Sequence, residues 1–228
     1  MNPTRLAAVA LAITGLCTPA WALDFTMNFD NIPVAMAPPP PPSQGFGSAV
    51  LGYYDNDPVY NRAGAQAWDT TFSSNALAIG SLQDPNGQGN FATAHSGFSA
   101  VGMVVGSSFD LVVTDGLYVS ALSLWYNVQP GSSTSLQLFS AGANVFSHAL
   151  SECSVGGADG FCGWTQYVVP ESALAGALIT RAAFSGLPNT AVFDDIAMTT
   201  TPVPEPSTYA FMLLGLSALA TLRRRRAR

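Results

Sequence analysis

The stretch Leu122-Ser123-Leu124-Trp125-Tyr126-Asn127-Val128 decides the fold class of this 228-residue chain. Its apolar residues alternate with Ser123, Trp125 and Asn127. In a β-strand successive side chains point to opposite faces, so one face of this segment is apolar and suited to a protein core. The pattern predicts a core strand.

Similar short segments, separated by Gly, Ser and Asn, lie on both sides of this stretch. They predict an all-β domain over residues 23–202, an antiparallel two-sheet sandwich or jelly roll. Residues 37–44 hold a proline run that predicts a rigid surface loop, and residues 171–177 predict one helical turn. Strands are expected at 25–29, ending at Asp30, and at 101–105, 109–113, 117–128, 135–139, 145–150, 164–169, 178–184 and 191–198.

The N-terminus has the pattern of a secretory signal peptide. Arg5 supplies the positive charge, residues 6–16 are apolar, and Ala20-Trp21-Ala22 is a small-x-small cleavage site. We therefore expect signal peptidase to remove residues 1–22. The mature protein then begins at Leu23.

The C-terminal tail combines a Pro-rich segment, Val203 to Thr208, with the uncharged run 209–222 and a basic cluster. Fourteen residues span about 21 Å as a helix, which is short for a hydrocarbon core of about 30 Å. The run predicts a single hydrophobic helix that is a marginal anchor, held with its basic end in the cytoplasm. The basic cluster is Arg223, Arg224, Arg225 and Arg226.

This tail, residues 203–228, resembles the PEP-CTERM sorting domain, whose motif here is Pro204-Glu205-Pro206. The resemblance implies recognition and cleavage by an exosortase. It also implies an exported protein of a Gram-negative bacterium, with an inner-membrane intermediate and a final place in the cell envelope, at the surface or in the extracellular matrix.

The second half of the predicted sandwich resembles the jelly-roll domain that often precedes such tails. That domain is itself similar to galactose-binding-like and carbohydrate-binding modules. The segments that carry the resemblance are Phe109-Asp110-Leu111, Ala121 to Trp125, Gly163 to Val169, Ala183 to Gly186 and Val192 to Ile196.

The charge balance restricts the partners. The chain has 14 acidic and 8 basic residues, lacks lysine, and places only Arg62 and Arg181 between the two terminal segments. Binding to nucleic acid is therefore not expected, because phosphates require clustered basic side chains. The sequence also lacks a nucleophile elbow, a His-Glu-x-x-His motif and a phosphate-binding loop, so we expect no enzymatic activity.

Cys153 and Cys162 are the two cysteines that remain after signal removal. Export places them in an oxidising compartment, where a pair so close in sequence is expected to form a disulfide. A metal pair is the alternative, but neither His95 nor His148 lies at ligand spacing from them.

Three acidic residues are candidate metal ligands. Asp30 follows the first predicted strand, whereas Asp194 and Asp195 lie in the last one. In jelly rolls of the resembled class the first and last strands are neighbours, and a structural calcium is often bound there. The resemblance thus implies a structural calcium site at Asp30, Asp194 and Asp195. A solvated acidic surface is the alternative.

Trp125 is the candidate for ligand binding because Ser123 and Asn127 make its face of the strand polar. Sugar stacking suits an exposed indole, and Tyr53, Tyr54 and Trp68 are further aromatic candidates. Packing of Trp125 beneath a loop is the alternative.

We therefore expect a structural or adhesive protein of the biofilm or floc matrix. A polysaccharide-binding module is the alternative function, followed by a secreted glycan-active enzyme.

Overall fold

The computed structural model confirms an all-β antiparallel sandwich. The ranges predicted as signal peptide (residues 1–21), proline-rich loop (37–44) and sorting tail (204–228) lie outside the part that the structure describes, Ser217 excepted. The described residues are 22–30, 32, 48–50, 54, 68–81, 93–104, 106–114, 116–157, 160–203 and 217.

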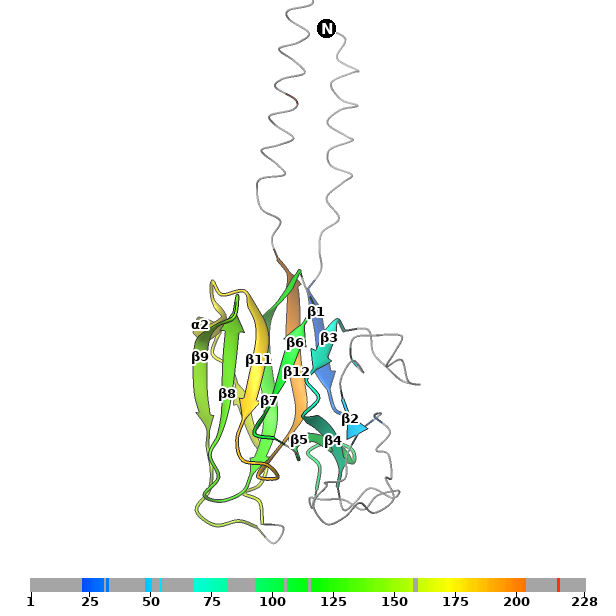
Figure 1. The fold of residues 1–228 in the computed structure, drawn as a ribbon, viewed down its shortest axis with the longest axis vertical. Helices are drawn as coiled ribbons and strands as arrows, with labels where there is room; N and C mark the ends of the chain where they lie inside the picture. The colour runs from blue at the N-terminus through cyan, green and yellow to red at the C-terminus, as the bar shows by residue number, and fades with distance from the viewer. Residues whose placement is uncertain are drawn as a thin grey trace, which may run out of the picture.

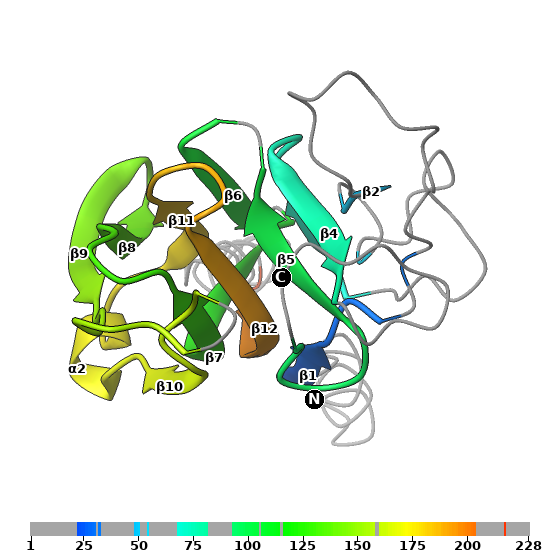
Figure 2. The same cartoon turned by 90° about the horizontal axis from the view of Figure 1, so that it is seen from below.

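Hydrogen bonds connect the strands into one 12-stranded sheet that folds into two layers (Figures 1 and 2). Within the first layer β11 is central, because it pairs with β6 on one side and with β8 on the other. The order of this layer is β3 (Thr70–Phe72), β6 (Ser108–Val113), β11 (Ile179–Ser185), β8 (Thr134–Ser140) and β9 (Ala143–Leu150).

The second layer has the two longest strands at its centre, and a single bridge between Ile179 and Val119 joins it to the first. Strand β1 (Leu23–Met27) pairs with the second half of β12, and the short helix α2 (Glu171–Leu174) contacts β7. The order is β2 (Ser48–Ala49), β4 (Ala76–Gly80), β5 (Ser99–Met103), β12 (Ala191–Pro202), β7 (Leu117–Val128) and β10 (Thr165–Val168).

The main core lies between the layers, and aromatic rings cross it. Phe184 of the first layer contacts Phe193 of the second, with ring centroids 4.8 Å apart, and stacks on Phe109 at 4.7 Å. The apolar face predicted for β7 enters this core: Leu122, Leu124, Tyr126 and Val128 are all buried. Burial of this face drives the formation of the sandwich.

A second, smaller core covers the outer face of the second layer. Val192 of β12 is buried there, together with Ala94 and Phe161 from two covering loops. Residues that pair across a ladder share a face, so the outer face of β7 lies beside this cluster at Asn127, the partner of Val192. This core determines where the candidate site forms.

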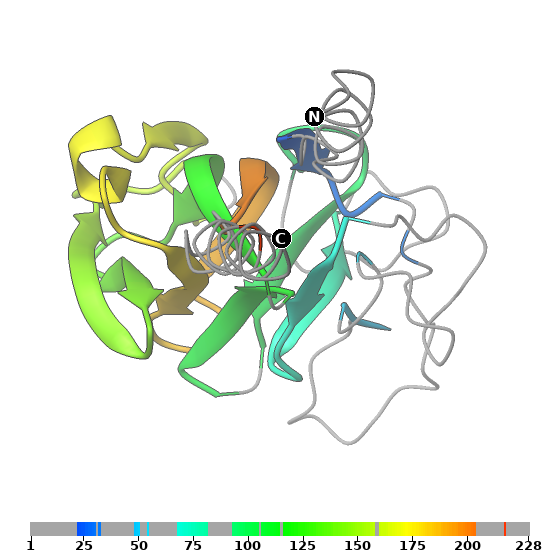
Figure 3. The ribbon, with the colours of Figure 1, turned by 90° about the horizontal axis from the view of Figure 1, so that it is seen from above.

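The start of β1 and the end of β12 lie at the same end of the sandwich, because Leu23 pairs with Thr200 (Figures 1 and 3). After β12 the Val203 N–H donates to the Gly116 carbonyl at 2.8 Å. Among the described residues, none belongs to a helix long and apolar enough to cross a membrane.

One expectation about the strands needs correction. The first strand ends at Met27, because Phe29 adopts a left-handed conformation (φ 61°) and donates its N–H to the Tyr54 hydroxyl at 3.1 Å. The further short strands expected between residues 30 and 101 had no predicted bounds, and the structure has β2, β3 and β4 there, each of two to five residues.

Candidate functional site

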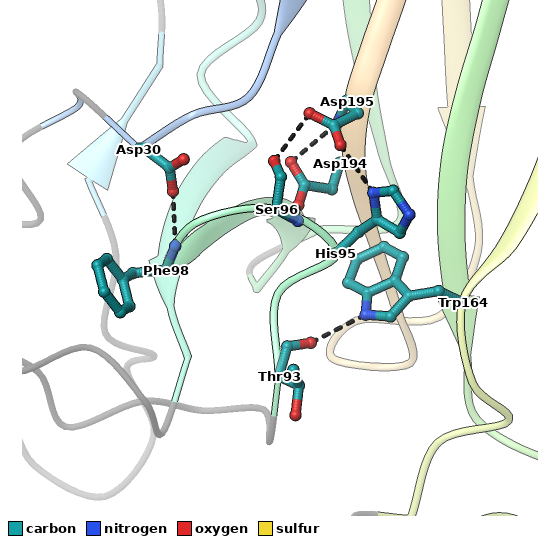
Figure 4. Close-up of polar contacts among 8 residues, drawn as sticks. All are labelled: Asp30, Thr93, His95, Ser96, Phe98, Trp164, Asp194 and Asp195. Carbon is teal, nitrogen blue, oxygen red and sulfur yellow. Dashed lines mark hydrogen bonds and ion pairs between the residues drawn. The ribbon is translucent and has the colours of Figure 1, made fainter.

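The candidate site lies where the loop of residues 93–98 covers the outer face of β12 and β7 (Figure 4). Asp194 pairs with Trp125 in the β12–β7 ladder, so both side chains start from this outer face. The loop buries the Asp194 carboxylate completely (0% exposed).

A bulge in β12 brings two consecutive carboxylates to the same loop. The register with β7 shifts between Asp194 and Ala197, and Asp195 has a φ of 43°. A regular strand would point neighbouring side chains to opposite faces, whereas a bulge changes the direction of one of them. Both carboxylates therefore reach the 95–96 segment of the loop (Figure 4).

Hydrogen bonds hold this loop to the bulge. The Ser96 N–H donates to Asp194 Oδ2 at 2.9 Å, and the Asp195 N–H donates to Asp194 Oδ1 at 2.8 Å. The Ser96 hydroxyl donates to Asp195 Oδ1 at 2.8 Å, while His95 Nδ1 lies 2.7 Å from Asp195 Oδ2. Every oxygen of the two carboxylates thus has a polar partner.

Asp30 joins the same loop from the N-terminal side. Its Oδ1 accepts the N–H groups of Phe98 and Ser99 at 2.7 and 3.0 Å. The carboxylate lies against Gly97 (φ 52°), where an added Cβ would overlap it. The predicted proximity of the two chain ends is therefore present, and residues 95–99 connect them.

The pKa of Asp194 is raised from 3.8 to about 8, and burial of the carboxylate is the largest cause. The like charges of Asp195 and Asp30 contribute to this rise because they disfavour another anion, whereas hydrogen bonds from the Ser96 and Asp195 N–H groups oppose it. Arg181, the one Lys or Arg side chain in the described ranges, pairs with Asp110 at 3.0 Å. Among the described residues, no Lys or Arg side chain therefore neutralises the Asp194–Asp195 cluster.

The cluster could hold a metal ion through His95, Asp194 and Asp195, whose ligand atoms lie within 4.8 Å of one another. Asp30, the third predicted ligand, lies outside this group. An imidazole nitrogen with carboxylate oxygens suits zinc and other transition metals, while calcium prefers oxygen alone. No sequence pattern pointed to His95, which is a lone histidine in a loop.

Trp125 is half-buried, and its indole stacks on the His95 imidazole with centroids 3.9 Å apart. Trp164 meets the same imidazole edge-on at 5.8 Å and donates its Nε1–H to the Thr93 carbonyl at 2.9 Å. Asn127, expected to make this face polar, is buried and accepts the Gly163 N–H at 2.8 Å. The face around Trp125 is therefore partly covered by loops.

The other aromatic candidates have packing roles. Tyr54 is buried and stacks on Trp68 at 5.2 Å, and Trp68 stacks on Phe25 at 4.8 Å. Tyr54 thus has no exposed face for sugar stacking, while Trp68, half-buried, uses its ring for these two stacking contacts. Tyr53 lies outside the described residues.

The predicted disulfide between Cys153 and Cys162 is present. It closes the loop that carries Phe161 into the second core, and the Cys162 N–H donates to the Val128 carbonyl at 2.8 Å. The disulfide therefore holds the segment that leads into Trp164.

The fold and the tail define an exported β-sandwich with a sorting signal. Residues 202–226 match the model of the PEP-CTERM protein-sorting motif, which confirms the predicted sorting signal and implies processing by an exosortase at the membrane. The hydrophobic helix expected within it stays a prediction. The match begins where β12 ends, at Pro202. No curated protein matches the chain.

Comparison with solved structures finds similarities at low identity. The K2 cleaved adhesin domain of Lys-gingipain is 17% identical, with 77% of this chain and 97% of that one covered and a TM-score of 0.45. The Stig cyclase Fisc from Fischerella sp. TAU is 9% identical (80% and 100% covered, TM-score 0.39). The module TmCBM61 in complex with β-1,4-galactotriose is 14% identical (57% and 86% covered, TM-score 0.36). Similarities at this level assign no ligand to this chain.

Proposed function

We propose that this chain is a non-catalytic structural or adhesive protein of the cell envelope or exopolysaccharide matrix, with a role in biofilm or floc. Signal peptidase would remove residues 1–22, and an inner-membrane intermediate would then be cut by the exosortase near Pro204, Glu205 and Pro206. The sandwich would remain as the mature protein.

The position of the sorting motif relative to the last strand carries this proposal. Strand β12 ends at Pro202, and the last described contact of the domain is the Val203 N–H bond to Gly116. All described core residues lie between Phe25 and Met198. Cleavage at residues 204–206 would therefore release a domain whose core and ladders remain complete.

The test is the location of the exported protein in its host. The wild-type protein is expected in the surface and matrix fractions, and replacing Arg223 to Arg226 with serine should reduce retention at the membrane before cleavage. A wild-type protein that remains in the periplasm, free of surface and matrix, would contradict the proposal.

A glycan-binding module is the second candidate, and the aromatic group at Trp125 favours it. Its indole is held in place by His95 and lies beside the exposed Gln166, its partner in the β7–β10 ladder. A fixed indole next to a hydrogen-bonding side chain suits a pyranose ring. Neutral sugars are the expected class, because the lysine-free acidic chain repels anionic polymers.

Affinity electrophoresis in gels that contain neutral glycans, including the host exopolysaccharide, tests this role. Gln166→Ala should weaken retardation while the fold stays intact, and Gln137→Ala on β8 of the other layer is the matched control. Equal retardation of both variants and the wild type would contradict a glycan site at β7 and β10. Turnover of the same glycans, followed in parallel, would contradict a non-catalytic role.

A structural cation is a third part of the proposal. Calcium was predicted at Asp30, Asp194 and Asp195, and the ligand atoms of His95, Asp194 and Asp195 are close enough for one ion. At a free ion concentration of about 100 times the dissociation constant, binding would add roughly 2.7 kcal/mol to the free energy of unfolding. Melting curves in calcium, in zinc and in chelator decide: superimposable curves reject a site for either ion.

A further inference from the structure

Strand β9 is an open edge of the first layer. It pairs with β8 from the Thr134–Leu150 pair to the Ser140–Ala143 pair, and no other described strand pairs with it. In Figures 1 and 2 it forms the outer margin of the domain. One side of its backbone therefore presents N–H and C=O groups without a strand partner in the described part of the chain.

This edge lacks the features that usually prevent strands from pairing between molecules. Such edges are protected by charged side chains, by proline or by short length. Strand β9 has the sequence Ala-Asn-Val-Phe-Ser-His-Ala-Leu, is 8 residues long and contains neither a Lys, Arg, Asp or Glu nor a proline. Val145 is 46% exposed, and Ser147 and Ala149 beside it are also exposed.

The charge distribution indicates a second copy of this chain as the occupant. The chain carries a net charge of −6, so two copies repel each other over most approaches. Residues 116–151, which contain β7, β8 and β9, include no Asp, Glu, Lys or Arg. Antiparallel contact of β9 with β9 of a second copy therefore brings the two molecules together along their uncharged segment.

The edge is also held rigidly enough to act as a template. Ala141 and Gly142, both with positive φ (48° and 81°), join β8 to β9 in a two-residue turn that suits a twisted hairpin. From β9 the His148 ring stacks on Tyr167 of β10 at 4.1 Å, which connects the strand to the second layer. Little conformational entropy is then lost when a partner strand docks.

We propose that β9 is a self-association edge, at which two copies pair antiparallel about a two-fold axis and continue the first layers as one sheet. The contact is isologous, so it closes as a dimer. The dimer carries two Trp125 faces, yet its formation is independent of glycan binding.

Sedimentation velocity of the exported protein over a range of concentrations tests the proposal. Val145→Lys places a charge on each edge and should raise the dimer dissociation constant by about tenfold or more. Val155→Lys is the matched control, because Val155 is 79% exposed and lies in the disulfide loop, outside β9. Its dimerisation should equal that of the wild type, and melting curves verify that both variants fold.

Hydrogen exchange identifies the surface. Amides of β9 that do not bond to β8 should gain protection as the concentration rises through the dimer range, and Val145→Lys should abolish this gain. A wild-type protein that stays monomeric, or a dimer that Val145→Lys leaves unchanged with β9 amides unprotected, overturns the proposal. So does a monomer whose β9 amides become protected only by an extended segment of another protein, which would assign the edge to that partner.

Discussion

The ring centroids of the His95 imidazole and the Trp125 indole lie 3.9 Å apart, and the two stacked ring planes are inclined by 17°. The contact joins the loop of residues 93–98 to the central strand β7 of the second layer. Because His95 also contacts Asp195, the same side chain connects the aromatic and the acidic halves of the site. Because Trp125 is only half-buried, its indole can contribute both to packing and to contact with a ligand.

A double-mutant cycle measures this contact. Trp125→Ala should lower the free energy of unfolding by about 1–3 kcal/mol, because a half-buried ring is lost. His95→Ala should show a coupling energy with it of about 0.5–1.5 kcal/mol. Denaturant titrations of the four proteins give the values. Strict additivity would show that the two rings contribute independently.

The stability of the metal-free protein should fall as the pH rises. Asp194 has a pKa raised from 3.8 to about 8 in the folded state, so between these values the folded state binds more protons than the unfolded state. Stability from this group is thus full below about 4 and is lost as the pH rises to about 8. Unfolding titrations in chelator between these limits should show the decrease.

Asp194→Asn is the matched variant for this pH dependence, since it is neutral at every pH and keeps the size of the side chain. Its stability should vary less over the same range. If the wild type and Asp194→Asn show parallel pH profiles, the titration of Asp194 does not control stability.

Loss of the disulfide should loosen one loop more than the whole sandwich. Cys153 and Cys162 are separated by 9 positions, and closing such a loop contributes roughly 2–3 kcal/mol. Replacing both with alanine should increase exchange of the Cys162 and Gly163 amides while β8 and β11 stay protected. Uniform deprotection of every strand would show that the disulfide supports the entire fold.

The fold was predictable where side chains alternate over a long strand. The range 117–128 was predicted with the bounds that β7 has, because apolar and polar residues alternate along its second half, from Leu122 to Val128. Strands β2 and β3 have only 2 and 3 residues, and the apolar residues of β4 (Ala-Leu-Ala-Ile-Gly) do not alternate with polar ones. Local pattern cannot identify strands that are stabilised mainly by tertiary contacts.

The site was predictable only as far as neighbouring strands determine it. Asp30 and the Asp194–Asp195 pair do meet at one loop, as the expected contact of the first and last strands implies. The role of His95 comes from the bulge at Asp195 and from the loop that covers it, neither of which has a sequence pattern. The same covering loops buried Asn127, so the face of Trp125 is less polar than alternation alone suggested.

The intact mass of the protein recovered from the envelope and matrix of its host tests the central claim most directly. The account predicts a species that begins at Leu23 and ends within or close to Pro204-Glu205-Pro206, so that the sandwich through Pro202 is complete. A mass that still includes residues 209–228 would contradict release of the domain by an exosortase.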